Sequence, residues 1–320
     1  MNKLLTIVIP VYNVEKYIYD CLESVRKQTY KDFNVIIVDD GSTDNSINIA
    51  KEICNKDNRF KIISKKNGGL SDARNYGLNY VETKYVTFLD SDDFINTNTY
   101  EKLINNLETN DNDIVVADIE YYYTNINNNF ILKGLNTKVS NDINKQSLLS
   151  PMFAWNKVYK LEYFKSINQL YPIGLWYEDI PVTTLLFTNT NKIGYVEEVL
   201  YYYRQNDDSI MSQKSKRNEE IFKILEIVID NFKHRNIYNK YYDEIEYLLI
   251  EHTRIYGLYR FLVQDNYKNL YNRSNMFIKT YFPKYKKNIY IKYLGIKNKL
   301  FIYTLNKYTL FIYRWYLVRK

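Results

Sequence analysis

The sequence predicts an α/β fold with a mostly parallel sheet flanked by helices, followed by a helical C-terminal region. Over the first 120 residues, short apolar and β-branched runs alternate with helical patterns. That alternation is typical of a doubly wound sheet whose strands are buried on both faces. From about residue 214 the pattern is helical to the end. We therefore expect an α/β domain at residues 1–213 and a mainly helical region at 214–320.

Five runs have the length and composition of buried strands, at residues 4–10, 33–39, 60–64, 85–89 and 113–119. Apolar residues at helical spacing predict helices near residues 17–25, 47–54 and 100–107. Residues 121–150 are rich in Asn and weakly patterned. Order returns over 151–205, where we expect a helix after residue 179 and one or two strands in 192–204. The predicted strand at residues 4–10, rather than a signal peptide, accounts for the apolar start of the chain.

Charge is distributed unevenly along the chain. Residues 1–213 hold 22 Lys and Arg against 28 Asp and Glu, whereas residues 214–320 hold 22 against 9. After Asp265 there are 13 basic residues and no acidic one. The only histidines are His234 and His252, so the first 213 residues contain neither a Ser-His-Asp triad nor a zinc site built on His.

Polar clusters follow the first four predicted strands, each at the point where the strand ends. They are "PVYN" (10–13), "DDGSTD" (39–44), "KKNGG" (65–69) and "DSDD" (90–93). In open α/β sheets, ligands bind outside the carboxyl ends of the strands. Because four clusters converge there by topology, this edge is the predicted binding site.

The Asp90-Ser91-Asp92 sequence places two carboxylates one residue apart at a strand end. Mg²⁺ and Mn²⁺ prefer such oxygen ligands, with a substrate phosphate completing the shell. An isolated D-x-D is more often a solvated loop that caps the next helix. Its place beside three other polar strand ends favours the metal site.

The second and third clusters are each followed by a helical pattern. A well-capped turn explains Gly41 to Asp44, but not the two acids before them, which could accept a nucleobase N–H or a ribose hydroxyl. Gly68 and Gly69 allow close backbone approach, and Arg74 lies one turn into the helix, within reach of a phosphate. Neither a G-x-G-x-x-G motif nor a P-loop is present.

Together, "TIVIPVYNVEKYI", "VDDGSTDNS", "NGGLSDARNYGL" and "FLDSDD" resemble glycosyltransferase family 2, the inverting nucleotide-sugar transferases with a GT-A fold. The resemblance is clearest over residues 1–120 and extends to about 210. It implies a nucleotide-sugar-binding part at 1–120 and an acceptor side at 121–213. It also implies a hexosyl- or N-acetylhexosaminyltransferase that uses Mn²⁺ or Mg²⁺ and a nucleotide-sugar donor, UDP being expected.

The resemblance assigns roles on the donor side to residues of all four clusters. Pro10, Val11 and Tyr12 would border the nucleobase, and Asp40 would contact uracil. The remaining nucleotide-binding residues would be Gly68, Gly69, Arg74, Asp90 and Ser91, with Asp92 the closest metal ligand and Asp90 the second.

On the acceptor side, the family's catalytic base is an Asp in an "ED" pair. "WYEDIPV" supplies Glu178 and Asp179, with Asp179 as the base. Acids also favour a helix N-terminus without catalysis. Trp155 and Trp176 flank this region and could stack on a sugar, although core packing is the commoner use of Trp. The Q-x-x-R-W motif of processive members is absent, which favours transfer of one sugar per visit.

The segment 300–318 is aromatic and apolar but contains Lys307 and Arg314, seven residues apart and hence on one face of a single helix. It fits an interfacial helix at an anionic membrane better than a spanning one; a core-packed helix or a homo-oligomer interface are alternatives. We expect a cytoplasmic enzyme, peripheral at the inner face of the cell membrane, beside a lipid-linked glycan acceptor.

Two rival functions remain open at this point. A sugar-nucleotide nucleotidyltransferase would share the topology but needs a Gly-rich phosphate loop after the first strand, which "PVYNVEKY" lacks. A non-catalytic protein that binds nucleic acid or membrane through the basic half would need neither Asp179 nor the D-x-D pair. We expect no nucleic-acid partner.

Overall fold

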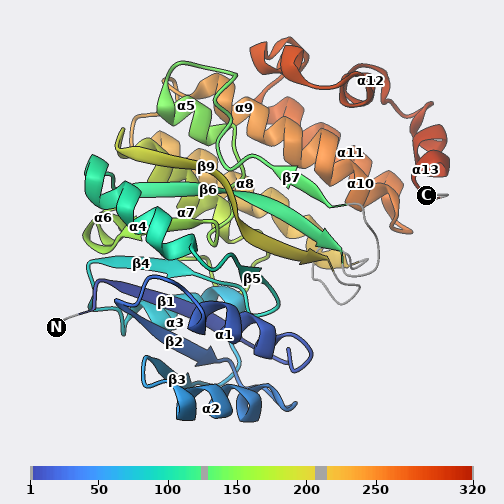
Figure 1. The fold of residues 1–320 in the computed structure, drawn as a ribbon. Helices are drawn as coiled ribbons and strands as arrows, with labels where there is room; N and C mark the ends of the chain where they lie inside the picture. The colour runs from blue at the N-terminus through green and yellow to red at the C-terminus, as the bar shows by residue number, and fades with distance from the viewer. Residues whose placement is uncertain (1–2, 124–128, 206–214, 319–320) are drawn as a thin grey trace. The chain divides into compact units, whose positions relative to one another are not determined.

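The computed structural model describes residues 3–123, 129–205 and 215–318 of the 320-residue chain (Figure 1). The chain divides into two compact units, which are described separately. The first unit comprises Met1–Asn136, Ser150–Gly174 and Glu178–Asp207. The second comprises Thr137–Leu149, Leu175–Tyr177 and Asp208–Lys320. The domain boundary expected at residue 213 falls outside the described residues.

The described strands of the first unit form one sheet. Their bounds are β1 Leu5–Val11, β2 Phe33–Asp39, β3 Phe60–Ser64, β4 Tyr85–Phe88, β5 Phe94–Ile95, β6 Ile114–Tyr123, β7 Phe130–Leu132, β8 Lys157–Lys160 and β9 Ile193–Gln205. The sheet order is β3-β2-β1-β4-β8-β6-β9-β5, and β7 pairs with β6 outside this path. The strand positions expected from the sequence are thus confirmed to within a few residues.

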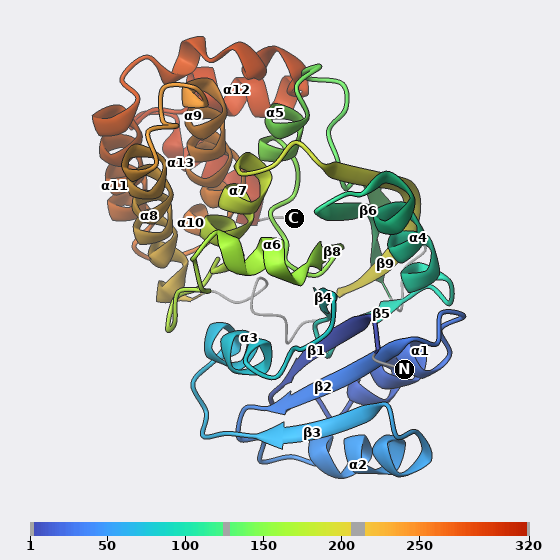
Figure 2. The same cartoon turned by 90° about the vertical axis from the view of Figure 1, so that its left-hand side faces the viewer.

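The half of the sheet made by β3, β2, β1 and β4 is entirely parallel. All seven residues of β1 are buried, which explains its unbroken apolar sequence. Helices α1 (Ile18–Arg26), α2 (Ser46–Lys56) and α3 (Leu70–Leu78) connect these strands, and Figure 2 shows α3 on one face of the sheet with α1 and α2 on the other. The carboxyl ends of β1, β2, β3 and β4 therefore meet at one edge, as the sequence predicts.

The other half of the sheet is mixed rather than mostly parallel. Strand β8 runs antiparallel between β4 and β6, while β9 pairs parallel to β6 and antiparallel to β5. The β6–β9 register shifts around Asp118, whose buried carboxylate accepts hydrogen bonds from Gly134 N (2.8 Å), Lys133 Nζ (2.9 Å) and Tyr195 Oη (2.5 Å). This carboxylate links three chain segments at the irregular point of the sheet. Helices α4 (Thr99–Asn110), α6 (Leu161–Ser166) and α7 (Asp179–Thr188) complete the unit.

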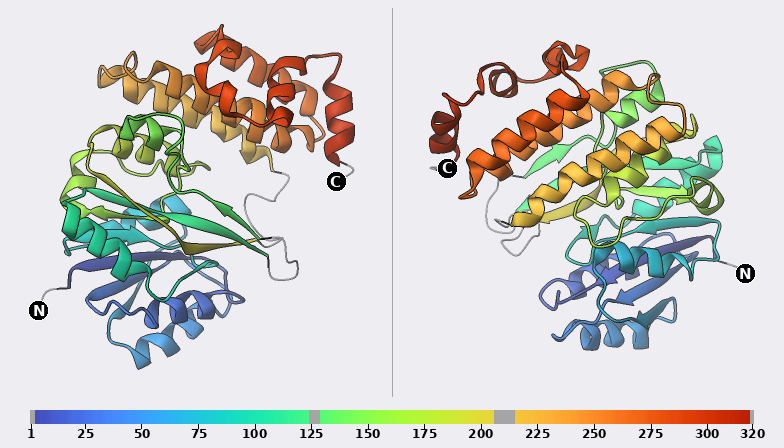
Figure 3. Two further views of the ribbon diagram at one scale, coloured as in Figure 1. Left: turned by 45° about the horizontal axis from the view of Figure 1, so that its top comes forward. Right: turned by 180° about the vertical axis from the view of Figure 1, so that it is seen from behind.

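The second unit is helical in its described residues. Its α-helices are α5 Ile143–Leu148, α8 Glu220–His234, α9 Tyr242–Ile250, α10 Tyr256–Leu262, α11 Tyr267–Tyr281, α12 Ile296–Thr304 and α13 Leu310–Val318. A π-helical turn at Glu251–Ile255 joins α9 to α10, and short 3₁₀ turns lie at Lys216–Glu219, Tyr285–Lys287 and Ile289–Tyr293. The long helices α8 and α11 lie side by side (Figure 3, right), where Phe222 contacts Phe277.

The prediction of a single helix over 300–318 is wrong, because the segment forms two helices separated by residues 305–309. The side chain of Asn306 accepts hydrogen bonds from the backbone N–H of Tyr308 (2.8 Å) and Thr309 (3.2 Å). An Asn that bonds to nearby N–H groups competes with helix continuation. Lys307 therefore lies in a turn and does not share a helix face with Arg314.

No helix in the described part of the chain has the length and apolar composition needed to cross a membrane. Helices α12 and α13 each have nine residues.

Gly77 allows helix α3 to lie close to the sheet. A Cβ at this position would approach Val8 Cγ1 to 2.5 Å and Val38 Cγ2 to 3.0 Å, on two neighbouring strands. Since α3 also carries Arg74, the position of that side chain depends on this close packing.

We predict that Gly77→Ala destabilises the protein. The added methyl group overpacks the contact, at a cost of about 1–3 kcal/mol, of which the better helix propensity of Ala offsets about 1 kcal/mol. Urea unfolding should show a lower midpoint. The control is Gly295→Ala, because a Cβ at Gly295 meets nothing within 4 Å. Equal midpoints for the two variants would contradict the packing argument.

Candidate active site

The turn after β4 is fixed by Asp93, the third carboxylate of "DSDD". Asp93 is completely buried and accepts hydrogen bonds from Tyr201 Oη (2.6 Å) and from the backbone N–H of Arg204 (2.8 Å). Its burial, together with the charges of Asp92 and Asp90, raises the pKa of Asp93 well above its usual range. Asp93 is thus a structural anchor between this turn and β9, whereas Asp90 and Asp92 are both partly exposed.

The side chain of Arg204 links the same turn to helix α1. Its Nε donates to the carbonyl oxygen of Asp92 (2.9 Å), and its Nη2 donates to Asp20 on α1 (3.2 Å). The guanidinium also lies over the rings of Tyr17 and Phe94, at 5.3 and 5.1 Å from their centroids. Neither Arg204 nor Asp93 was predicted as part of the site, because their partners lie more than 100 residues away in the sequence.

Arg74 joins the D-x-D turn to the "ED" pair. Its guanidinium is 2% exposed, with Nη2 at 2.7 Å from Asp90 Oδ1 and Nη1 at 2.5 Å from Glu178 Oε1. Although burial opposes it, the charges of Asp90 and Glu178 raise the pKa of Arg74, which therefore stays charged. The planar fork of an Arg suits two carboxylates at once. The nucleotide contact expected of Arg74 stays a prediction.

Asp179 is the first residue of α7 and is partly exposed. Burial of the carboxylate and the adjacent charge of Glu178 raise the pKa of Asp179 to about 7, against the opposing charges of Arg74 and Lys157. A carboxylate that titrates near neutrality is suited to general-base catalysis, because it is both ionised and basic at the operating pH. This is the role that the sequence predicted for it.

Lys157 is a second group near Asp179 whose pKa lies near 7. It was not among the residues predicted from the sequence. It is completely buried on β8, where its Nζ donates to Phe153 O (2.7 Å), Asn156 Oδ1 (2.6 Å) and Pro151 O (3.1 Å). Burial lowers the pKa of Lys157 to about 7, while the charge of Asp179 opposes this change. Whether the buried Lys157 is charged therefore depends on whether Asp179 is ionised, and the reverse also holds.

The predicted donor side lies at the ends of β1, β2 and β3. Pro10 and Val11 are buried in β1, whereas Tyr12 is 50% exposed. Asp40 is buried, and its carboxylate accepts hydrogen bonds from Lys65 Nζ (2.7 Å) and from two backbone N–H groups. Those two groups belong to Gly68 (2.9 Å) and Gly69 (2.7 Å).

The observed role of Asp40 is to hold the glycine turn that leads into α3. Gly69 has φ +86°, a conformation that side chains other than Gly rarely adopt. Ser91 is buried within the D-x-D turn. The contact of Asp40 with uracil, and the nucleotide contacts of Gly68, Gly69 and Ser91, stay predictions.

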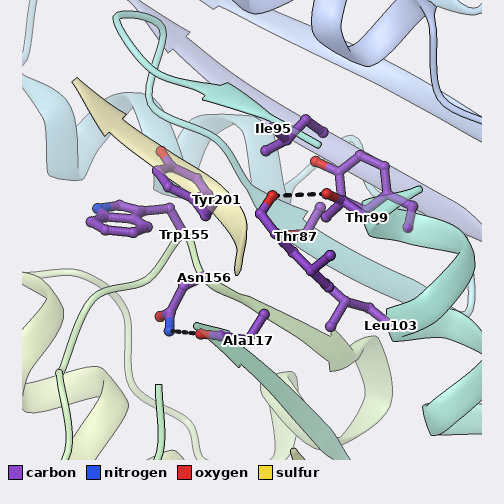
Figure 4. A pocket seen from close by; sticks show the side chains of 10 residues that line it. Thr87, Ile95, Thr99, Leu103, Ala117, Trp155, Asn156 and Tyr201 are labelled. Carbon is purple, nitrogen blue, oxygen red and sulfur yellow. Dashed lines mark hydrogen bonds between the residues drawn. The ribbon is translucent and has the colours of Figure 1, made fainter. Parts of the chain in front are cut away.

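Trp155 and Trp176, the two tryptophans predicted on the acceptor side, both have packing partners within the protein. Trp155 is 6% exposed and stacks between Phe153 (4.5 Å) and Tyr201 (4.0 Å). It lines a cavity of about 10 Å³, room for one water at most, among apolar side chains and the polar ones of Thr87, Thr99 and Asn156 (Figure 4). Trp176 belongs to the second unit, where its ring lies 4.9 Å from the guanidinium of Arg217. Stacking of an acceptor sugar on either ring stays a prediction.

The residues at the D-x-D turn fit a divalent ion that also binds substrate. Asp90 and Asp92 offer carboxylate oxygens, which Mg²⁺ and Mn²⁺ prefer. Arg74 occupies one oxygen of Asp90. In the part of the chain that the structure describes, no group of three or more His, Cys, Asp or Glu side chains could hold a metal. An ion here would thus require further oxygens from a bound diphosphate.

Comparison with known proteins identifies the family. Residues 6–168 match the family "Glycosyl transferase family 2". The chain belongs to this family. It is therefore a glycosyltransferase, and of the functions considered from the sequence, neither the nucleotidyltransferase nor the non-catalytic alternative is supported.

Two curated relatives and one solved structure illustrate the similarity. The glycosyltransferase GlyG of Streptococcus pneumoniae is 30% identical over 66% of this chain and 74% of its own length. The minor teichoic acid biosynthesis protein GgaB of Bacillus subtilis is 32% identical over 68% of this chain but only 25% of its own length. The S. aureus TarS 1–349 complex with UDP-GlcNAc has a TM-score of 0.60 and 20% identity, over 89% of this chain and 92% of that chain. The expected GT-A fold with a helical C-terminal region is confirmed.

We predict that Arg74→Lys lowers transferase activity without unfolding the protein. A single ammonium group keeps the buried positive charge but cannot bond two separate carboxylates as a guanidinium does. Transfer rates should fall tenfold or more, with the melting temperature changed by only a few degrees.

The control is Arg59→Lys, which alters a comparable ion pair, that of Arg59 with Asp57 (2.5 Å), before β3 at the opposite end of the parallel strands. Equal activity losses in the two variants would show that the Arg74 fork has no special role.

Proposed function

We propose that this protein transfers a single sugar from a UDP-sugar to a glycan acceptor with inversion at the anomeric carbon. The observation that carries the proposal is the connection between Asp179 and the D-x-D turn. Asp179 titrates near pH 7, and the adjacent Glu178 shares the guanidinium of Arg74 with Asp90. Two ion pairs thus join the D-x-D turn to Glu178, the residue directly before the proposed base.

Inversion requires one displacement at the anomeric carbon. The acceptor hydroxyl oxygen forms its bond to that carbon while the bond to the diphosphate oxygen breaks, and the diphosphate leaves with the electron pair. Asp179 takes the hydroxyl proton, a contribution of typically 10²–10⁴-fold. Its position at the N-terminus of α7 places it beside Glu178, which Arg74 holds in a fixed orientation.

We propose that Asp92 and Asp90 hold Mn²⁺ or Mg²⁺. The ion supplies a Lewis acid for the negative charge that develops on the leaving diphosphate. The chain itself keeps the two aspartates in place through Asp93 and Arg204, which bond to Tyr201 and to the main chain of the turn. Arg74 bonds one carboxylate oxygen of Asp90, and we propose Asp92 as the closer ligand, as the family resemblance implies.

The donor would be a UDP-hexose or UDP-N-acetylhexosamine. The UDP-GlcNAc complex of TarS, which has the same fold, supports this choice. In this chain, the half-exposed ring of Tyr12 and the glycine turn held by Asp40 lie at neighbouring strand ends, where a nucleotide would bind. The absence of Q-x-x-R-W favours transfer of one sugar per visit.

The acceptor would be a glycan of a bacterial surface polysaccharide. The similarity to GgaB, named for minor teichoic acid biosynthesis, supports this setting. We propose that the acceptor is carried on a lipid at the inner face of the cell membrane, where the enzyme binds peripherally.

We predict that UDP-sugars, rather than GDP- or dTDP-sugars, are hydrolysed slowly without acceptor in Mn²⁺ or Mg²⁺, releasing UDP. EDTA should abolish the release. In calorimetry, Asp92→Ala should weaken UDP binding in Mn²⁺ but leave the weaker binding in EDTA unchanged. Equal UDP affinity with and without EDTA would remove the metal from the proposal, and release from GDP- or dTDP-sugars alone would change the donor.

We predict that Asp179→Asn leaves UDP affinity nearly unchanged but lowers the transfer rate by about 10²-fold or more, since it removes only the base. In the wild type, kcat/KM should fall as the pH drops below about 7, because only ionised Asp179 accepts a proton. Glu178→Gln removes a charge that raises the pKa of Asp179. In this variant the acidic limb of the pH profile, where kcat/KM falls, should therefore move to lower pH. A pH limb that persists unchanged in Asp179→Asn would assign the base to another group.

A further inference from the structure

The last two helices of the second unit expose an unusually apolar surface. Six large side chains on α12 and α13 are each 51–80% exposed, and we call this surface the outer face: Ile296, Leu300, Tyr303, Phe311, Ile312 and Trp315. On α12 they recur at positions i, i+4 and i+7, which places them on one side of the helix. On α13 they recur at i, i+1 and i+4. On each helix the exposed apolar side chains therefore form one stripe rather than scattered positions.

The opposite side of the same helices packs into the protein. Phe301, Leu305 and Leu310 are buried in a cluster with Leu258 and Leu262 of α10. Helix α13 also lies against α10 within this helical unit. The core-packed alternative that the sequence left open thus explains the inner side, whereas the six side chains of the outer face remain 51–80% exposed.

Basic residues flank the outer face in the sequence, with Lys297 and Lys299 on α12, Lys307 in the turn and Arg314 on α13, and no acidic residue lies after Asp265. Lys297 Nζ lies 5.1 Å from the ring centroid of Tyr259, Lys307 Nζ lies 4.8 Å from that of Tyr308, and the Arg314 guanidinium lies 4.1 Å from that of Tyr267. Aromatic bulk with adjoining Lys and Arg is the composition of helices that lie in an anionic membrane interface.

Two observations decide between the occupants of this surface. Helices α12 and α13 are nine residues each, about 14 Å long, and too short to cross a hydrocarbon core of about 30 Å. A second copy bound through the same face would bring Lys and Arg against Lys and Arg, since a twofold interface pairs a patch with itself. An anionic bilayer surface offers an apolar environment for these side chains and negatively charged headgroups for the Lys and Arg residues.

We propose that the outer face of α12 and α13 docks on the surface of an anionic phospholipid bilayer. Its six apolar side chains enter the boundary between headgroups and acyl chains, while the flanking Lys and Arg contact the headgroups. This inference rests on the proposed function for the reason to be at a membrane, namely a lipid-linked acceptor. Binding itself does not depend on catalysis.

Flotation of the full-length protein with vesicles tests the proposal. We expect it to float with phosphatidylcholine vesicles that contain phosphatidylglycerol at low salt, and to remain at the bottom with phosphatidylcholine alone. Phe311→Ser/Trp315→Ser should reduce the bound fraction at least tenfold. Lys299→Glu/Lys307→Glu should reduce it similarly, since each basic residue near the surface contributes about fivefold to partitioning. The matched control is Leu170→Ser/Ile173→Ser, two residues that are also 60% exposed but lie in the other unit.

Full-length protein that stays at the bottom with anionic vesicles at low salt would overturn the proposal. A dimer in solution that Phe311→Ser/Trp315→Ser converts to a monomer, without flotation of the wild type, would assign the outer face to a second copy and overturn it as well. UDP release from soluble donors, measured on the same preparations, keeps this test separate from the proposed function. We expect that release to be equal in the wild type and in the outer-face variants, whereas its absence in the wild type would count against the enzyme reaction alone.

Discussion

The buried guanidinium of Arg74 is the constraint on which the rest of the site depends. It is 2% exposed and bonds both Asp90 and Glu178, which come from parts of the chain 88 residues apart. Removing one partner from a buried ion pair costs about 3–5 kcal/mol, because the remaining charge stays buried. Neither carboxylate can therefore move away from Arg74 cheaply. The turn after β4 and the start of α7 keep a fixed relation through this one side chain.

Arg74 itself is placed by the packing of α3. Gly77 lies against Val8 and Val38, so the helix approaches β1 and β2 closely. At the other end of the helix, Asp40 holds the Gly68 and Gly69 turn from which α3 begins. The polar residues at the strand ends thus have two kinds of function. Some face the predicted ligand site, whereas Asp40 and Asp93 face the protein and hold the others in position.

The parallel half of the fold and the location of the site could be predicted from the sequence, because both depend on local patterns. Buried strands are apolar along their whole length, and the carboxyl ends of parallel strands meet at one edge. Lys157 and Arg204 could not be found in this way. Their roles come from antiparallel pairing of β8 with β4 and from the return of β9 to the D-x-D turn, and such long-range pairings leave no local signal. The break at Asn306 was missed because aromatic and apolar residues dominate on both sides of it, although the Asn side chain had the chemistry to end a helix.

A site without histidine obtains groups that titrate near neutrality by desolvation. Burial raises the pKa of the Asp179 carboxyl to about 7 and lowers the pKa of the Lys157 ammonium to about 7. The same physical effect acts in opposite directions because burial penalises the charged form, which is the deprotonated form of Asp and the protonated form of Lys. Each group also favours the charged form of the other. The ionised state of Asp179 therefore depends on the proton held by Lys157, and a change that exposed either side chain to water would move both pKa values back toward their usual ranges.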